Sequence, residues 1–147
     1  MSTGKGTADK APHFEMVMRV RDYEVDVQGI VNNANYLHYL EHTRHEFCRE
    51  AGVSFASMHA DGIDPVLRHV DITYINPLTL GEQMRSCLTL SRRGARFMFH
   101  QQIFGYPDNR PVVDAQVTVV CLENGRLTRG DSLAEAFKAY LSDDECT

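Results

Sequence analysis

Long hydrophobic runs and paired cysteines are both missing from this sequence of 147 residues. No stretch approaches the roughly 20 apolar residues of a membrane-spanning helix, and residues 1–12 lack the apolar segment of a signal peptide. The four cysteines form no Cys-x-x-Cys pair and show no zinc-like spacing, so we predict neither a disulfide framework nor a zinc site. A cytoplasmic protein without membrane insertion is therefore expected.

Excess positive charge is absent as well. The sequence has 15 Lys and Arg against 20 Asp and Glu, which gives a formal net charge of −5. Because nucleic-acid binding needs a broad basic face, this balance disfavours a nucleic-acid partner. With 43% hydrophobic residues, the chain is expected to bury one core without disulfides.

The longest uninterrupted element in the sequence is a predicted helix. Residues 32–51 contain no Pro or Gly, and Gly52 follows as a stop signal. Its apolar stripe, at spacings of 3 and 4, consists of Leu37, Leu40, Arg44, Phe47 and Ala51. A helix this apolar is expected to be wrapped by other elements.

The remaining periodicity predicts strands and two shorter helices in a single domain, residues 13–141. Alternating patterns predict strands at 14–23, 66–75, 83–91, 96–106 and 111–122, and helices are predicted at 54–60 and 131–140. In the second strand we expect Leu67 on the face opposite Val70. Residues 1–12 are predicted to be a disordered tail and residues 142–147 an acidic tail.

This order of elements predicts an α+β fold. Consecutive strands joined by short turns must be antiparallel, and a single long apolar helix in a small chain belongs against one face of the sheet. We therefore expect a five-stranded antiparallel sheet curled around the helix. Such a sheet keeps edge strands, so a homo-oligomer is expected.

The segment that leads into the long helix resembles the opening signature of hot-dog-fold acyl-CoA thioesterases. It is residues 21–36, RDYEVDVQGIVNNANY, followed by Leu37, Tyr39, Leu40, Glu41 and Arg44. The nearest likeness is to the 4-hydroxybenzoyl-CoA thioesterase-like group, including the Tol-Pal-associated type. The resemblance implies hydrolysis of acyl-CoA without a cofactor, by a homodimer or homotetramer with active sites between subunits.

By this resemblance Asp26 is the catalytic carboxylate, either as a nucleophile or as a general base on water. Taken alone, an Asp before a Gly turn is more commonly a helix cap or turn residue. Gly29 and Asn33 complete the predicted catalytic loop beside a helix N-terminus, whose N–H groups suit an oxyanion. Many bacterial relatives have histidine where this chain has Asn33, and plant acyl-carrier-protein thioesterases have one that would fall on Ile30. Asn33 cannot take up a proton at neutral pH, which leaves Asp26 as the only base.

Predicted substrate-binding residues are Tyr36 and the basic cluster Arg92, Arg93 and Arg96. The resemblance places Arg92 and Arg93 on the CoA nucleotide, whose phosphates suit arginine. Without the resemblance, arginines at a hairpin are solvated surface.

Glu41 is a second carboxylate on the long helix. We expect an ion pair with Arg44 at i+3 and keep Glu41 as the reserve nucleophile, because another set of hot-dog thioesterases uses a helix carboxylate. His38, His42 and His45 have passable metal-ligand spacing. Three ligands on one helix rarely converge on one ion without a fourth, so we predict a polar stripe and no metal.

Three other functions remain as alternatives. An acyl-carrier-protein thioesterase would share the chemistry, and a non-catalytic acyl-CoA-binding module would share only the fold. The presence of Asp26 argues against the binding module. A hot-dog hydratase needs an Asp/His pair at the start of the helix, and Ile30 and Asn33 supply no histidine there.

Overall fold

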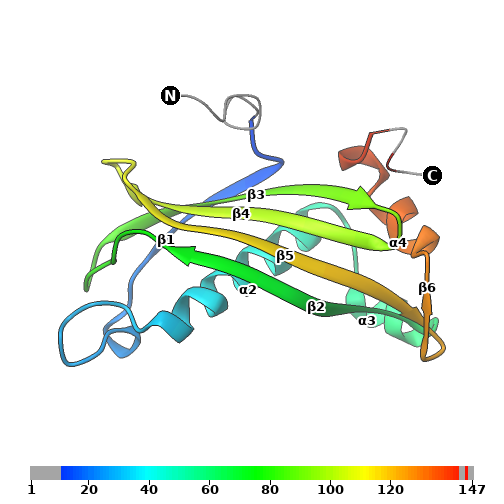
Figure 1. The fold of residues 1–147 in the computed structure, drawn as a ribbon, viewed down its shortest axis with the longest axis horizontal. Coiled ribbons are helices and arrows are strands. Elements are labelled where there is room, and N and C mark those ends of the chain that lie inside the picture. The colour runs from blue at the N-terminus through cyan, green and yellow to red at the C-terminus, as the bar shows by residue number, and fades with distance from the viewer. Residues whose placement is uncertain (1–10, 143–144, 146–147) are drawn as a thin grey trace.

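The protein is a curled antiparallel sheet with one long helix on its inner face (Figure 1). The computed structural model describes residues 11–142 and 145. The strands are β1 (Phe14–Arg19), β2 (Ile63–Tyr74), β3 (Gln83–Arg93), β4 (Arg96–Tyr106), β5 (Pro111–Glu123) and β6 (Arg126–Thr128). Their order across the sheet is β1-β3-β4-β5-β2, and β6 pairs with β5.

The described residues also form three α-helices and two short 3₁₀ turns. The helices are α2 (Asn33–Glu50), α3 (Phe55–Ala60) and α4 (Asp131–Ala136), and the turns are η1 (Asp22–Glu24) and η2 (Lys138–Tyr140). None of the helices in the described part of the chain is long and apolar enough to span a membrane.

The α+β prediction is confirmed, with differences at the ends of elements. The sheet has a sixth strand, β6, because its three residues are too few for alternation to be seen in the sequence. The first strand ends at Arg19, and the closing helix stops at Ala136 before a 3₁₀ turn. Most of the two predicted tails, residues 1–10, 143, 144, 146 and 147, lies outside the described residues.

The buried face of α2 is rotated by about one residue from the predicted stripe. Leu37 is 42% exposed, whereas Tyr36, Leu40, Thr43 and Phe47 are buried. Thr43 is tolerated at the centre of this face because its hydroxyl donates to the carbonyl of Tyr39 at 2.8 Å and lies 2.7 Å from Ser86 Oγ. Thr43, a polar residue that was not part of the predicted stripe, therefore occupies a core position.

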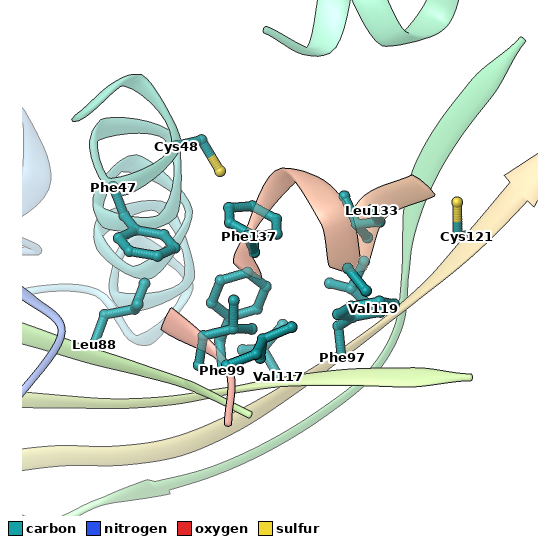
Figure 2. Close-up of a cluster of buried hydrophobic side chains, with 13 residues drawn as sticks. Phe47, Cys48, Leu88, Phe97, Phe99, Val117, Val119, Cys121, Leu133 and Phe137 are labelled. Carbon is teal, nitrogen blue, oxygen red and sulfur yellow. The ribbon is translucent and has the colours of Figure 1, made fainter. Parts of the chain in front are cut away.

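Aromatic rings join the second half of α2 to the sheet and to the C-terminal helices (Figure 2). The ring of Phe47 stacks on Phe137 with centroids 5.6 Å apart and meets Tyr140 at 4.8 Å. Phe14 and Phe99 lie on its other sides, at 6.1 and 6.2 Å. Such pairs contribute roughly 0.5–1.5 kcal/mol beyond the burial of their area, so α4 and η2 are part of the core.

Strand β2 forms one edge of the described sheet and is unusually exposed. It pairs only with β5, and its register shifts between Leu67 and His69, where Arg68 is the extra residue of a bulge. The bulge turns Leu67 to the same face as Val70, opposite to our prediction, since one inserted residue reverses the alternation. Four apolar side chains at the start and end of this strand are more than a third exposed: Val66, Leu67, Tyr74 and the following Ile75.

Candidate active site

Asp26 lies in a tight loop just before α2. Its backbone N–H donates to the carbonyl of Ile30 at 2.9 Å, and the N–H of Gly29 donates back to the carbonyl of Asp26 at 2.9 Å. Gly29 has φ of +82°, a left-handed conformation that favours glycine. The half-buried carboxylate accepts one hydrogen bond, from Gln28 N to Oδ1 at 2.8 Å.

Asp26 is therefore not the cap of the helix. That role belongs to Asn32, whose Oδ1 accepts from the N–H of Ala34 at 3.0 Å. Within the described residues, the second carboxylate oxygen of Asp26 accepts no hydrogen bond from the chain. The turn holds the side chain through one oxygen only.

A buried carboxylate, Glu24, fixes this loop. Its Oε1 accepts from the backbone N–H of Arg21 and from the hydroxyl of Tyr39, both at 2.8 Å. Its Oε2 pairs with the guanidinium of Arg21 at 2.8 Å. Burial alone would raise the pKa of Glu24, but these hydrogen bonds and the charge of Arg21 outweigh it and hold the pKa below its usual range.

The backbone of the loop is tied to α2 and to the connection between β2 and β3. The carbonyl of Glu24 accepts from Asn35 Nδ2 at 2.8 Å and from the N–H of Asn32 at 3.1 Å. On the other side, the N–H of Val31 donates to the carbonyl of Leu78 at 2.9 Å. Asp26 is thus carried by a loop that is fixed at both ends.

Of the predicted residues, Gly29 and Asn33 lie at the same end of α2 as Asp26. The side chain of Asn33 is exposed, and its carbonyl accepts from the hydroxyl of Tyr74 at 3.3 Å. Tyr36 is also at this end, but it is only 4% exposed and its hydroxyl accepts from the N–H of Leu78 at 3.0 Å. The hydroxyl of Tyr36 thus holds the loop before β3, and its contact with substrate stays a prediction.

The predicted basic cluster divides in two. Arg92 is buried and donates to Asp131 Oδ1 at 2.8 Å and to the carbonyls of Arg129 and Gly94 at 2.7 and 2.9 Å. Its guanidinium is therefore committed within the chain, which corrects its assignment to the CoA nucleotide. Arg93 and Arg96 are exposed at the hairpin between β3 and β4.

The expected ion pair between Glu41 and Arg44 is not formed within the described residues. Arg44 Nη1 instead donates to Gln101 Oε1 at 3.0 Å, and burial lowers the pKa of Arg44. Glu41 is exposed.

The histidines of α2 were considered as metal ligands. Ring nitrogen Nδ1 of His38 lies 3.2 Å from Asn35 Oδ1. The described residues contain no group of three or more His, Cys, Asp or Glu arranged to hold a metal ion.

A cavity of about 460 Å³ lies along the C-terminal half of α2, and residues of α3 and α4 also line it. Its lining combines polar residues of α2, α3 and β2 with an apolar floor from the sheet and α4. The lining residues are Glu41, Arg44, His45, Cys48, Phe55, Ala56, His59, Asp64, Pro65, Leu67, Phe97, Phe99, Val119, Leu133 and Phe137. No local pattern in the sequence predicts this cavity, because its lining residues come from separate elements.

Asp26 does not line this cavity. Helix α2 has 18 residues, and at ~1.5 Å per residue it spans about 27 Å. Figure 1 shows the loop before α2 at one end of the molecule and α3 and α4 at the other. The cavity lining on α2 begins at Glu41, so within one chain about 12 Å of helix separates the helix start beside Asp26 from the cavity.

Residues 20–141 match the family described as the Thioesterase-like superfamily. The chain belongs to this superfamily. Its curled sheet around one long helix is the hot-dog fold. The crystal structure of YbaW, a probable thioesterase from Escherichia coli, has a TM-score of 0.76 and 28% identity, and the match covers 87% of this chain and 98% of YbaW.

Two relatives of this superfamily member have named activities. The acyl-acyl carrier protein thioesterase ATL3 of Arabidopsis thaliana is 31% identical over 121 residues, covering 82% of this chain and 64% of the plant protein. The long-chain acyl-CoA thioesterase FadM of Escherichia coli is 33% identical over 107 residues, covering 72% of this chain and 80% of FadM. This chain thus spans less than two thirds of the plant relative's length.

For this thioesterase-like chain, we predict that Glu24→Gln weakens folding in a pH-dependent way. The pKa of Glu24 is held below its ordinary value in the folded chain, so its charge adds stability above the unfolded pKa, and that stability is lost as pH falls through the folded pKa. Urea unfolding at pH 7 should show a loss of about 1–3 kcal/mol. The gap between the two proteins should narrow as the pH falls below the unfolded pKa.

The exposed Glu50 on α2 supplies the matched control, since Glu50→Gln makes the same chemical change without a network. Its stability should follow that of the wild type across the pH series. A gap for Glu24→Gln that stays constant down to acid pH would show that the charge of Glu24 does not stabilise the loop.

Proposed function

We propose that this chain is a thioester hydrolase that cleaves an acyl- or aryl-CoA to the free acid and CoA, with Asp26 as the catalytic carboxylate. The observation that carries the proposal is the position of Asp26. It is on a loop fixed by Glu24, beside the N-terminus of α2, with one carboxylate oxygen that no described group binds. Family membership gives the class of reaction.

The chemistry can follow either of two routes from this geometry. As a nucleophile, Asp26 attacks the thioester carbonyl carbon, the thiolate leaves, and water then cleaves the mixed anhydride. As a general base, Asp26 takes a proton from water, and the resulting hydroxide attacks the same carbon. Because thiols have pKa values near ~8.5, the thiolate leaves without a strong acid or a metal.

The neighbours of Asp26 have supporting roles in this proposal. Gly29 permits the turn that directs the carboxylate. The backbone N–H of Asn33, the first residue of α2, would be the donor to the developing oxyanion, because the N–H groups of Ala34 and Asn35 already donate to Asn32. The exposed side chain of Asn33 orients the water or the acyl carbonyl. Glu41, which lines the distant cavity, stays the reserve carboxylate.

The subfamily, the location and the carrier of the acyl group are also part of the proposal. Membership of the 4-hydroxybenzoyl-CoA thioesterase-like group stays a prediction, as does a cytoplasmic location. Acyl carrier protein is the alternative carrier, favoured by the name of the plant relative, whereas the name of FadM favours CoA. Exposed Arg93 and Arg96 offer donors to the CoA phosphates.

We further propose a homodimer or homotetramer whose active site joins two subunits. Apolar side chains are exposed along β2 at Val66 and Leu67 and around Asp26 at Tyr23 and Val27, which is typical of an interface. A two-fold axis that pairs two β2 edges antiparallel also runs the two α2 helices antiparallel. The loop of one subunit would then face the cavity of its partner.

The decisive test of the mechanism is Asp26→Asn. Asparagine keeps the acceptor for the N–H of Gln28, so the melting temperature should stay close to that of the wild type, while kcat should fall by ~10²-fold or more. Thiol release from a panel of aliphatic and aryl-CoA thioesters supplies the measurement. Glu41→Gln is the matched control, and retention of activity by Asp26→Asn with its loss in Glu41→Gln would transfer the catalytic role to Glu41.

The quaternary prediction is tested by light scattering at micromolar concentration. The mass should be at least twice the 16.7 kDa of one chain, because the exposed edge and the separated halves of the site both require a partner. A particle of one chain's mass that still hydrolyses thioesters would contradict a site shared between subunits.

The CoA contact is tested by the double change Arg93→Ala with Arg96→Ala. These side chains are remote from the carbonyl, so KM for acyl-CoA should rise several-fold with little change in kcat. Rising salt should raise KM in the wild type in the same direction. The matched control is Arg49→Ala with Arg126→Ala, two exposed arginines that give the same charge change; an equal rise in KM there would assign the effect to net charge.

A further inference from the structure

The cavity at the far end of α2 has an apolar floor and a polar rim. The floor consists of Cys48, Phe97, Phe99, Val119, Leu133 and Phe137, all buried. The rim carries the exposed side chains of Glu41, His45 and His59. At about 460 Å³, the cavity is within the range of ~300–1,000 Å³ that holds small-molecule ligands.

The floor is suited to hydrocarbon. Its six side chains offer no oxygen or nitrogen, and every buried side-chain N or O in the described part of the chain already has a hydrogen-bond partner. Arg44 also lines the cavity, and its Nη1 donates to Gln101. Among the six floor side chains, away from Arg44, a hydroxyl group on the ligand would lose its water without a replacement, whereas methylene groups gain from leaving water. A thioester end, which is polar, fits the rim.

Helix α4 forms one wall of this floor. Figure 2 shows Leu133 over Phe97 and Val119, and Phe137 between α2 and Leu133. The helix begins after Gly130, where a Cβ atom would lie 2.7 Å from the ring of Phe97. With six residues and no side-chain cap, α4 is too short to be stable by itself, so its position depends on the groups that hold it.

Besides the apolar packing of Leu133 and Phe137, the group that holds α4 is Arg92. Its side chain is 1% exposed and pairs with Asp131, the first residue of α4, at 2.8 Å. The same guanidinium donates to the carbonyls of Arg129, Gly94 and Glu145 at 2.7, 2.9 and 3.1 Å. Arg92 therefore ties the β3–β4 hairpin to the segments on both sides of α4.

We propose that the acyl group of the substrate is an aliphatic chain that lies on this floor, and that α4, held by Arg92, is the wall that limits its length. This rests on the proposed thioester hydrolase and adds the substrate class and the specificity-determining element. Leu133 and Phe137 set the depth, and Arg92 is a positioning residue. The thioester end of the substrate lies at the polar rim and therefore outside the apolar floor.

The test measures binding, so that it does not depend on hydrolysis. S-alkyl-CoA thioethers of increasing chain length cannot be hydrolysed, and their Kd is measured by calorimetry with the wild type. Affinity should rise about fourfold per buried methylene, until the chain meets α4 and the rise stops. Hydroxyaryl-CoA thioethers should bind more weakly than the aliphatic chain at that length.

Two variants should move the break, the chain length at which affinity stops rising, in opposite directions. Leu133→Ala removes side-chain volume from the wall, so the break should shift to longer chains. Leu67→Phe adds volume at a position that lines the cavity but is 46% exposed, so it should shift the break to shorter chains without disturbing the core. Because Leu67 also lies on the proposed β2 interface, light scattering must show the wild-type mass for this variant. Leu88→Ala is the control, because Leu88 is fully buried but does not line the cavity.

Arg92→Met tests the positioning role. If Arg92 positions α4, the variant should lose affinity unequally for long and short chains, so that the affinity no longer stops rising at one sharp chain length. A purely structural role would lower the melting temperature and leave the break at the same chain length. The same break in the wild type, Leu133→Ala and Leu67→Phe would overturn the proposal, as would tighter binding of hydroxyaryl thioethers. Loss of hydrolysis alone would count only against the proposed reaction, because thioether binding is read separately.

Discussion

The candidate active site depends on the buried carboxylate of Glu24. Three donors surround it, two from Arg21 and one from Tyr39 on α2, and the carbonyl of the same residue binds Asn32 and Asn35. A buried charge is costly unless it is fully hydrogen-bonded, so these partners have little freedom to move. The loop that carries Asp26 takes its orientation from this arrangement.

The long helix divides the tasks of the molecule between its two ends. The N-terminal end has the fixed loop, a capped helix start and the carboxylate, while the C-terminal end has the apolar cavity closed by α3 and α4. A rigid helix of this length keeps the two apart within one chain. In the proposed oligomer the exposed β2 edge brings them together across subunits.

Arg92 shows how the role of a side chain can be assigned wrongly from its residue type alone. A pair of arginines at a hairpin is equally suited to binding phosphate and to bracing a neighbouring helix. The structure separates them, because strand alternation turns Arg92 inward over the ring of Phe97 at 5.1 Å and leaves Arg93 outside. Tyr36 is turned inward in a similar way, since the rotation of the helix buries its hydroxyl against Leu78.

The sequence by itself determined the long helix, the antiparallel strands and the loop around Asp26, because these follow from local periodicity, glycine turns and a motif of adjacent residues. It did not determine the rotation of α2, the bulge at Arg68, the short β6 or the cavity. Each of these depends on contacts between residues far apart in the chain, such as Thr43 with Ser86 or Arg92 with Asp131. Only the tertiary structure decides which side chains such contacts bury, since burial and hydrogen-bond partners belong to the packed chain and not to any single segment.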